Sequence, residues 1–340
     1  MNKTILVTGG TGYIGSHTVV ELQQSGYNVI IVDNLSNSNI EILDSIEKIT
    51  GIKPKFEKLD LVDEKKTREF FIENKNIEAV IHFAAYKAVG ESVELPLKYY
   101  KNNLCSLINI IENMREHDIK NIVFSSSCTV YGQPEQLPVT ESAPILKALS
   151  PYGNTKQVSE EIIYDTVQQN NINCIALRYF NPIGAHKSGL IGELPLGVPN
   201  NLLPYLMQVA VGKRDYLRVF GNDYETKDGT CIRDYIHVTD LAKAHVIALK
   251  RLLENKNKDK YEVFNLGTGK GYTVLEVIKS FEKVTQKELP YKILERRAGD
   301  ITAVYADTAY ANNELGWKAQ LELDDMVLSA WVWEQHYMKY

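Results

Sequence analysis

The chain has 340 residues, of which 44% are hydrophobic and 24% are charged, and its formal net charge is −5 at pH 7. These values are ordinary for a globular protein and leave room for two domains. The acidic balance argues against a nucleic-acid-binding surface, which is normally basic. Charge or glycine interrupts every apolar run well short of ~18 residues, so we expect no transmembrane helix.

The N-terminal sequence MNKTILVTGG enters a strand pattern at once and lacks the architecture of a signal peptide, so we expect a cytoplasmic protein. The four cysteines are widely spaced and form neither a CxxC motif nor a Cys/His ligand pattern. We therefore expect isolated reduced thiols and no metal site.

The first half of the chain alternates short β-rich runs with helical patterns, which is typical of βαβ units and a parallel sheet. We expect an α/β fold in which residues 1–180 form a Rossmann-type, doubly wound parallel sheet that binds NAD. The expected strands lie near 4–8, 29–33, 55–58, 79–83, 122–126 and 174–179. The expected helices lie near 13–25, 64–74, 97–116 and 152–169.

The amino-acid composition changes after the sequence RYFNP at 178–182. Residues 181–235 are rich in Gly, Pro and Asn around one helical segment near 201–211, and helical patterns follow at 239–253, 274–284 and 323–336. We expect residues 181–340 to form a smaller, mixed α/β domain that binds the substrate. Some segments near 236–266 are expected to return to the first domain.

A glycine-rich turn follows the first expected strand. Gly9, Gly12 and Gly15 form a G-x-x-G-x-x-G pattern between that strand and a helix. Such glycines allow a tight turn and let a pyrophosphate approach the amides of the helix N-terminus. A glycine triplet alone is weak evidence, because any turn-rich loop can contain one. Its place between a strand and a helix favours a dinucleotide site.

Two carboxylates end the next two expected strands. Asp33 lies eighteen residues after Gly15, where it can accept hydrogen bonds from the adenosine ribose and would repel a 2′-phosphate. A turn-forming Asp beside Asn34 is the simpler alternative. Asp60 closes the third strand and could accept from the adenine amino group. Asp33 favours NAD over NADP.

Tyr152 and Lys156 are spaced i and i+4, on one face of an expected helix. A phenol titrates near ~10, but a nearby ammonium stabilises the phenolate and lowers its pKa, so Tyr152 is a candidate general acid/base. Alone, such a pair is more simply a surface contact. Ser127, at the expected end of the fifth strand, changes that view, because open α/β sheets present their chemistry at strand ends.

With these motifs in this order, the chain resembles the extended short-chain dehydrogenase/reductase family, and within it the epimerases of sugar nucleotides. The resemblance covers nearly the whole length. It is carried by TGGTGYIGSHT (8–18), IHFAAYKAVGES (81–92), FSSSCTVYG (124–132), SPYGNTK (150–156), LRYFNPIGAH (177–186), FGNDYETKDGTCIRDYIHV (220–238) and RRAGD (296–300).

The resemblance implies which residues bind which ligand. Ser127 and Tyr152 are expected to touch the reacting hydroxyl, and Lys156 is expected to hold the nicotinamide ribose. The cofactor residues it implies are Gly9, Gly12, Tyr13, Ile14, Gly15, Asp33, Asn34, Asn37, Ser38, Asp60, Leu61, Phe83, Ala84, Lys87, Asn102 and Tyr179. The substrate residues it implies are Asn181, Asn201, Arg218, Val219, Phe220, Arg233, Arg297, Asp300 and Val304.

The implied activity is the inversion of the carbon 4 hydroxyl of UDP-glucose and UDP-galactose through a transient 4-keto sugar, with tightly bound NAD. A 4,6-dehydratase on the same fold is the nearest alternative, but it needs an acid/base pair beside the strand-end hydroxyl, where this chain has Cys128. A non-catalytic NAD-sensing protein is a second alternative. The catalytic side chains such a protein loses are all present here.

Two finer expectations come from relatives alone. Relatives restricted to simple hexoses carry a tyrosine four residues beyond the aspartate of R-x-G-D, whereas relatives that accept N-acetylhexosamines carry a small residue. That position is Val304, although Tyr305 is adjacent and a slip of one residue would restore the bulky side chain. Relatives also commonly form homodimers through the helices near 97–116 and 152–169, whose apolar positions could equally be core.

Overall fold

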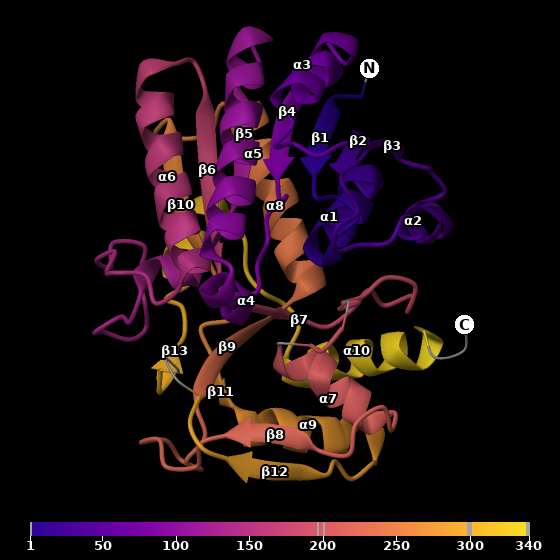
Figure 1. Ribbon diagram of the computed structural model, residues 1–340, viewed down its shortest axis with the longest axis vertical. Coiled ribbons are helices and arrows are strands. Elements are labelled where there is room, and N and C mark those ends of the chain that lie inside the picture. Colours follow the sequence, from indigo (N-terminus) through magenta and orange to yellow (C-terminus); the bar gives the residue numbers. More distant parts are fainter. Residues whose placement is uncertain (1, 196, 200, 298–300, 338–340) are drawn as a thin grey trace. The chain divides into compact units, whose positions relative to one another are not determined.

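The computed structural model describes residues 2–195, 197–199, 201–297 and 301–337. Its largest element is a seven-stranded sheet in the order β10-β6-β5-β4-β1-β2-β3 (Figure 1). The strands are β1 (Thr4–Thr8), β2 (Asn28–Asp33), β3 (Lys55–Lys58), β4 (Ile77–His82), β5 (Asn121–Ser127), β6 (Asn173–Tyr179) and β10 (Tyr261–Leu266). The pairs β3-β2, β2-β1, β1-β4 and β4-β5 run parallel.

The strand order reverses beside β1. The chain builds β1, β2 and β3 outward in one direction, and then returns to place β4, β5 and β6 on the other side of β1. Ligands of open α/β sheets bind at such a switch point, outside the carboxyl ends of the strands. The sequence order of the elements therefore places the candidate site at the ends of β1, β4 and β5.

Helices flank the sheet because every parallel connection must cross over it. They are α1 (Tyr13–Gln24), α2 (Ile42–Thr50), α3 (Glu64–Glu73), α4 (Val89–Glu94), α5 (Pro96–Glu116), α6 (Pro151–Gln169) and α8 (Val238–Leu253). Helices α3, α5 and α6 pack in that order, and α1 packs on α2 (Figure 1). All five residues of β1 are buried, as expected for a central strand covered on both faces.

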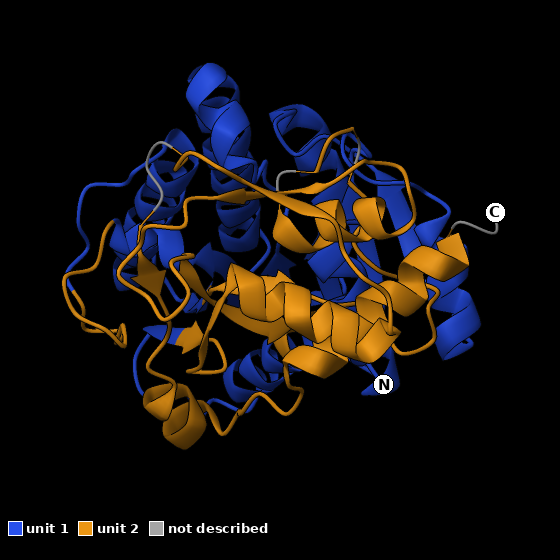
Figure 2. Ribbon diagram, turned by 90° about the horizontal axis from the view of Figure 1, so that it is seen from below, with its two compact units in different colours: residues 1–132, 144–178, 242–264 blue, residues 133–143, 179–241, 265–340 orange. Residues whose placement is uncertain are grey.

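The chain divides into two compact units, coloured separately in Figure 2. Unit 1 consists of residues 1–132, 144–178 and 242–264, and unit 2 of residues 133–143, 179–241 and 265–340. The segment 133–143, which the sequence analysis gave to the first domain, therefore groups with unit 2. Within unit 2, Val139 forms a parallel bridge with Ala306, and its carbonyl accepts a hydrogen bond from the side chain of Asn265 at 2.9 Å.

Unit 2 contains two small sheets. One has the order β11-β9-β13, with β7 also paired to β9, and the other pairs β8 with β12 in parallel. The strands are β7 (Asn181–Ile183), β8 (Leu217–Phe220), β9 (Ile232–His237), β11 (Gly271–Thr273), β12 (Tyr291–Leu294) and β13 (Ala303–Val304). The helices are α7 (Leu202–Ala210), α9 (Val274–Thr285) and α10 (Leu323–Tyr337), with a short turn η2 (Ala311–Leu315).

Each unit has its own hydrophobic core. In unit 1, side chains such as Leu6, Val80 and Phe124 fill the space between the sheet and the helices. In unit 2, Val219, Phe281 and Trp331 belong to a separate buried cluster. No helix among the described residues is long and apolar enough to cross a lipid bilayer.

Candidate active site

The glycine turn between β1 and α1 has space for backbone alone. Gly9 has φ +70°, and a Cβ there would lie 2.8 Å from the amide nitrogen of Ala84. A Cβ on Gly15 would lie 2.2 Å from the carbonyl oxygen of Gly9, which is a severe overlap. Gly12, the N-cap of α1, offers no side-chain cap to the first amides of the helix. These amides and the helix dipole form a site suited to a phosphate group.

Asp33, at the end of β2, braces this turn. Its Oδ2 accepts a hydrogen bond from the Thr11 amide at 3.3 Å, and its Oδ1 accepts from the Leu35 amide at 2.9 Å and the Ser38 hydroxyl at 3.3 Å. The hydroxyls of Thr11 and Ser38 lie 2.8 Å apart. Each carboxylate oxygen has two acceptor positions, so Oδ2 keeps one for a ribose hydroxyl.

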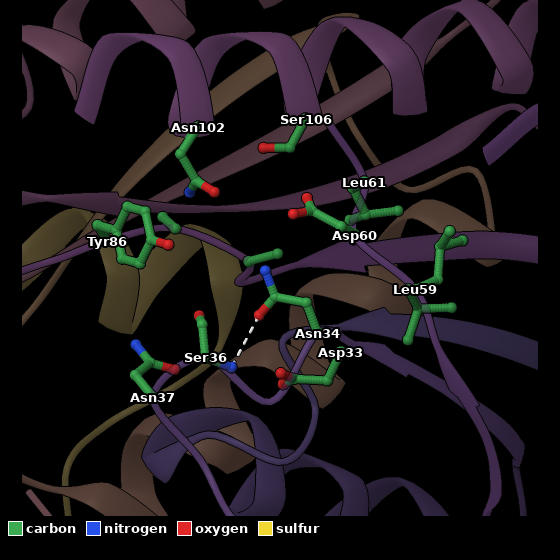
Figure 3. A pocket seen from close by; sticks show the side chains of 13 residues that line it. Asp33, Asn34, Ser36, Asn37, Leu59, Asp60, Leu61, Tyr86, Asn102 and Ser106 are labelled. Carbon is green, nitrogen blue, oxygen red and sulfur yellow. Dashed lines mark hydrogen bonds between the residues drawn. The ribbon is translucent and has the colours of Figure 1, made fainter. Parts of the chain in front are cut away.

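A pocket opens beside Asp33, at the ends of β2 and β3 (Figure 3). The Ser36 amide donates to Oδ1 of Asn34 at 3.0 Å and shapes the pocket's loop. Of the predicted cofactor residues, it is lined by Asp33, Asn34, Asn37, Asp60, Leu61, Ala84 and Asn102. Carboxylates at two strand ends beside apolar side chains suit a nucleoside.

Sequence reasoning missed several lining residues, namely Val32, Ser36, Leu59, Ala85, Tyr86 and Ser106. Ser106 follows Asn102 by four residues on α5, so the spacing of the helix would have placed both on one face. Tyr86 is held through its backbone, because the Asn103 side chain accepts from its amide at 2.9 Å and donates to its carbonyl at 3.1 Å. Nothing in the local sequence indicates that contact.

The other predicted cofactor residues lie at the start of α1, after β4 and at the end of β6. Tyr13 and Ile14 begin α1, and the ammonium of Lys87 lies 5.6 Å from the centroid of the Tyr13 ring. The ring of Phe83, which directly follows β4, lies 4.7 Å from that of His245. Tyr179 ends β6, and it groups with unit 2.

The N-terminus of α6 presents Tyr152. Ser150 caps this helix by accepting from the Gly153 amide at 3.1 Å, and Pro151 occupies its first turn. Ser127 ends β5 and begins the short turn η1 (Cys128–Tyr131), where its hydroxyl accepts from the Thr129 amide at 3.2 Å. The Ser127 side chain acts to lower the pKa of Tyr152, so the two side chains lie close together. The structure thus brings together two of the three predicted catalytic residues.

Lys156 lies one helical turn further along α6 and is only 5% exposed. Its ammonium donates to the carbonyl oxygen of Ser125 at 2.6 Å and lies 4.8 Å from the centroid of the Phe124 ring. Burial lowers the pKa of Lys156 to about 8, against the opposing effect of the Glu160 carboxylate. The ammonium is therefore held against the last residues of β5.

The pKa of Tyr152 differs from the sequence expectation. Burial raises it to about 12, with the hydrogen bond from Ser127 acting in the opposite direction and the Cys128 thiol adding to the rise. The prediction that Lys156 lowers this pKa is thus wrong for the protein alone, because burial of the phenol dominates. The phenol is a proton donor at neutral pH until a further positive charge stands beside it.

The predicted substrate residues lie in unit 2. In β9, the guanidinium of Arg233 donates to the carbonyl oxygens of Ile232 at 2.8 Å and Ile301 at 2.9 Å. The Arg297 guanidinium lies 4.3 Å from the centroid of the Phe220 ring. The Asn201 side chain donates to Glu193 at 3.1 Å. Asn181 starts β7 and pairs with Tyr235, whereas Asp300 falls outside the described residues.

The strand β8 carries the expected uracil-binding residues Arg218, Val219 and Phe220. Arg218 is exposed, whereas Val219 is fully buried. Among the described residues β8 pairs with β12 alone, so it is an edge strand of this small sheet.

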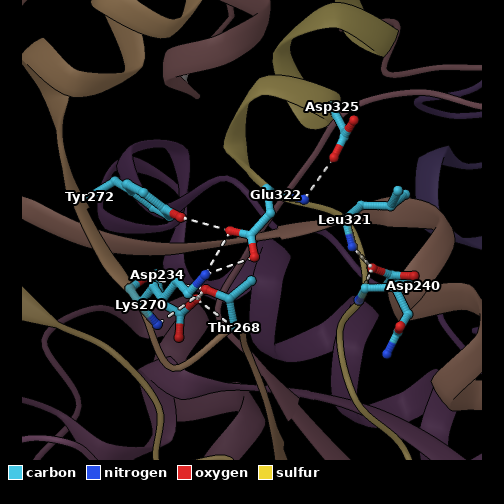
Figure 4. A network of polar contacts seen from close by, with 9 residues as sticks. Asp234, Asp240, Thr268, Lys270, Tyr272, Leu321, Glu322 and Asp325 are labelled. Carbon is cyan, nitrogen blue, oxygen red and sulfur yellow. Dashed lines mark hydrogen bonds and ion pairs between the residues drawn. The ribbon is translucent and has the colours of Figure 1, made fainter.

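Asp234, which sequence reasoning missed, organises the neighbourhood of Arg233 (Figure 4). Its Oδ1 accepts from the amide and hydroxyl of Thr268 at 2.8 and 2.7 Å, and its Oδ2 accepts from the amides of Gly269 and Ala306, both at 3.1 Å. Beside this loop, Lys270 pairs with Glu322 at 2.7 Å. Asp234 therefore ties β9 to the backbone that follows Val304.

The described residues contain no group of three or more His, Cys, Asp or Glu side chains placed to hold a metal ion.

Comparison with known proteins places this geometry in a family. Residues 6–329 match the family described as GDP-mannose 4,6 dehydratase. A UDP-glucose 4-epimerase of Bacillus subtilis is 56% identical over 331 residues, which cover 97% of this chain and 96% of the relative.

Two solved structures are similar over almost their whole lengths. A UDP-glucose 4-epimerase of Stenotrophomonas maltophila, with bound NAD and formylated UDP-arabinopyranose, has a TM-score of 0.95 at 46% identity, covering 99% of each chain. The enzyme of Bifidobacterium longum, in complex with NAD+ and UDP, has a TM-score of 0.93 at 50% identity, covering 98% of each chain. The chain belongs to the UDP-glucose 4-epimerase family of the extended short-chain dehydrogenases/reductases.

Proposed function

We propose that the protein interconverts UDP-glucose and UDP-galactose by inverting carbon 4 with bound NAD. The observation that carries this proposal is the proximity of two hydroxyl side chains, Ser127 and Tyr152, where the end of β5 meets the start of α6. One hydroxyl that can exchange a proton and a second that can orient the substrate are what reversible oxidation of an alcohol requires.

In this reaction, Tyr152 takes the proton from the 4-hydroxyl while Ser127 holds the same oxygen by a hydrogen bond. Bound NAD would supply the hydride acceptor and donor for carbon 4, and its positively charged nicotinamide would favour the phenolate of Tyr152. Lys156 adds a second positive charge and a donor for the nicotinamide ribose. The resulting 4-keto sugar turns about its phosphate linkage, and Tyr152 returns the proton when the opposite face is reduced.

The residues present fit NAD. The glycine turn has room for a pyrophosphate but for no added Cβ at Gly9 or Gly15, and the first amides of α1 carry no side-chain cap. Asp33 lies where it would accept from the ribose and repel a 2′-phosphate. The pocket between Asp33 and Asp60 would hold the adenosine end.

A UDP group carries negative charges that two arginines can clamp with charge-assisted hydrogen bonds. We propose Arg233 and Arg297 for this role, with Asn181 and Asn201 as further donors and the edge of β8 as the uracil site. Anchoring the invariant UDP leaves the hexose free to turn. The binding energy then comes from contacts with UDP, and neither face of the sugar is fixed.

The alternative dehydratase needs an acid beside the strand-end hydroxyl. The turn η1 has the sequence CTVY and contains no carboxylate. This composition favours epimerisation. The second alternative, a non-catalytic NAD sensor, would not require Ser127, Tyr152 and Lys156 together.

A single assay separates these activities. Purified protein incubated with UDP-galactose, without added NAD, should yield UDP-glucose, as followed by chromatography of the sugar nucleotides. A dehydratase would instead release a 4-keto-6-deoxy sugar nucleotide, and a sensor would leave the substrate unchanged. Denatured protein should release NAD, and an active preparation that contains no nucleotide and requires NADP would contradict the cofactor assignment.

We further propose that the protein accepts UDP-N-acetylhexosamines, because Val304 leaves space in the sugar pocket. Val304 pairs with Arg233 in register. A Cβ on Gly271 would lie 3.4 Å from the ring of Tyr305, so this ring is directed toward β11. Neighbouring side chains of a strand point to opposite faces, which supports Val304 as the residue on the sugar side.

Val304→Tyr should therefore abolish activity on UDP-GlcNAc while activity on UDP-galactose is kept, as measured by kcat/KM for both substrates. Tyr305→Phe is the matched control and should retain both activities. Wild-type protein that is inert toward UDP-GlcNAc would contradict the open pocket.

We also propose a cytoplasmic homodimer. Leu97 and Ile108 of α5 and Tyr164 of α6 are exposed apolar side chains on two helices that pack together. Sedimentation velocity should give about twice the mass of one chain, and a monomer would contradict this assembly.

A further inference from the structure

We propose that a buried ion pair, Glu160 with Arg178, is the positioning device that holds Ser127 in reach of Tyr152; this role rests on the proposed function. Glu160 lies on α6 and Arg178 on β6, and both are almost fully buried. The guanidinium grips the carboxylate with two bonds, Nε to Oε1 at 2.9 Å and a terminal nitrogen to Oε2 at 2.5 Å.

The pair contacts both ends of the segment that presents Ser127. Oε1 of Glu160 accepts a hydrogen bond from the Ser126 hydroxyl at 2.5 Å, directly before Ser127. The other side of the Arg178 guanidinium donates to the phenol oxygen of Tyr131 at 3.0 Å, at the end of η1. The Glu160–Arg178 ion pair therefore holds both the end of β5 and the turn η1 in place.

The same carboxylate belongs to the helix that carries the other two catalytic groups. Glu160 follows Lys156 by one turn and Tyr152 by two turns of α6. The ion pair thus links α6, β6 and the end of β5, the three elements that set the distance between the two catalytic hydroxyls. A misplacement of about 1 Å in such a site costs about 100-fold in rate.

Stability alone does not explain this pair. Taking two charges out of water is costly, and apolar residues of similar volume often replace a buried ion pair with neutral or favourable effect. What apolar residues cannot supply are four directed bonds in a fixed geometry. We therefore attribute the ion pair to its role in positioning α6, β6 and the end of β5 relative to one another.

The charge of Glu160 also acts on Lys156. Burial lowers the pKa of Lys156, and Glu160 opposes that effect. The other groups packed here are His82 of β4, whose pKa burial lowers to about 3, and Cys174 of β6 and Tyr261 of β10, whose pKa values burial raises. These three are neutral at pH 7, so Glu160 supplies the negative charge and Arg178 balances it.

The first test removes both charges together. Glu160→Leu combined with Arg178→Met should keep the bound NAD and alter the KM for UDP-galactose little, but lower kcat by about 10- to 100-fold. Its Tm should fall, because the buried Ser126 and Tyr131 hydroxyls lose their partners. The matched control is Glu262→Leu with Arg251→Met, a second buried pair of unit 1 with bonds of 2.7 and 2.8 Å, which should keep the wild-type kcat. Equal loss in both double variants, or no loss in the first, would overturn the proposal.

The second test uses Glu160→Gln, which keeps the volume and removes one negative charge. Removing an anion lowers the pKa of a neighbouring ammonium, so the alkaline limb of the kcat profile should move to lower pH. The double variant, which keeps the net charge, should show a smaller shift. If the double variant does not fold, an unshifted profile in Glu160→Gln overturns the proposal by itself. Wild-type protein without epimerase activity would instead refute the proposed function.

Discussion

Tyr152→Phe should lower the kcat for UDP-galactose by about 100-fold or more, the usual effect of losing a general acid/base. In the proposed reaction the phenol takes and returns the proton, and the backbone cap of α6 does not depend on its oxygen. The UDP-binding residues are separate from it, so the KM should change little.

Tyr100→Phe is the matched control for this experiment. Its phenol accepts a hydrogen bond from the Asn154 side chain at 2.7 Å, in the same first turn of α6, but it has no place in the proposed proton transfer. Turnover by Tyr100→Phe should stay near that of the wild type. Near-normal turnover by Tyr152→Phe would show that another group moves the proton.

Gly15→Ala should empty the cofactor site. The added Cβ would lie 2.2 Å from the Gly9 carbonyl oxygen and 2.9 Å from the Gly10 Cα, so the turn must open. Overpacking of this kind costs about 1–3 kcal/mol, and if this cost falls on the bound state it lowers the affinity for NAD by about 5- to 150-fold. The nucleotide released on denaturation, relative to protein, measures the effect.

Gly90→Ala serves as the control for that substitution. Gly90 is exposed on α4, and an added Cβ there meets no atom within 4 Å. This variant should purify with the wild-type content of NAD. Full NAD occupancy in Gly15→Ala would show that the pyrophosphate does not depend on this turn.

Much of unit 1 was predictable because its signals are local. The bounds of β1 and β3 agree with the sequence patterns, and those of β2, β4, β5 and β6 differ by at most two residues. Buried parallel strands read as unbroken apolar runs, and the glycine turn and the Y-x-x-x-K spacing are contained within single turns. The seventh strand, β10, was not predicted, because Glu262 within it reads as exposed until Arg251 is seen to neutralise it.

Unit 2 was harder to predict, since its order comes from distant contacts. β8 pairs with β12 across a gap of seventy residues. Segment 133–143 is held by backbone hydrogen bonds of Val139 to residues 305 and 307, and by hydrogen bonds of Asn265 to the Val139 carbonyl and the Glu141 side chain. The burial of the Asp234 and Glu160 carboxylates could not be predicted from the sequence for the same reason. A charged residue reads as a surface position in sequence, and only the fold reveals the amides or the guanidinium that make its burial favourable.

The central claim is that carbon 4 gives up a hydride inside the site and receives the same hydride back. The most direct measurement is the conversion of UDP-galactose labelled with deuterium at carbon 4, in ordinary water and without added NAD. Mass spectrometry of the UDP-glucose formed should show the deuterium retained at carbon 4. Loss of the label to solvent, or turnover only with added cofactor, would contradict the account.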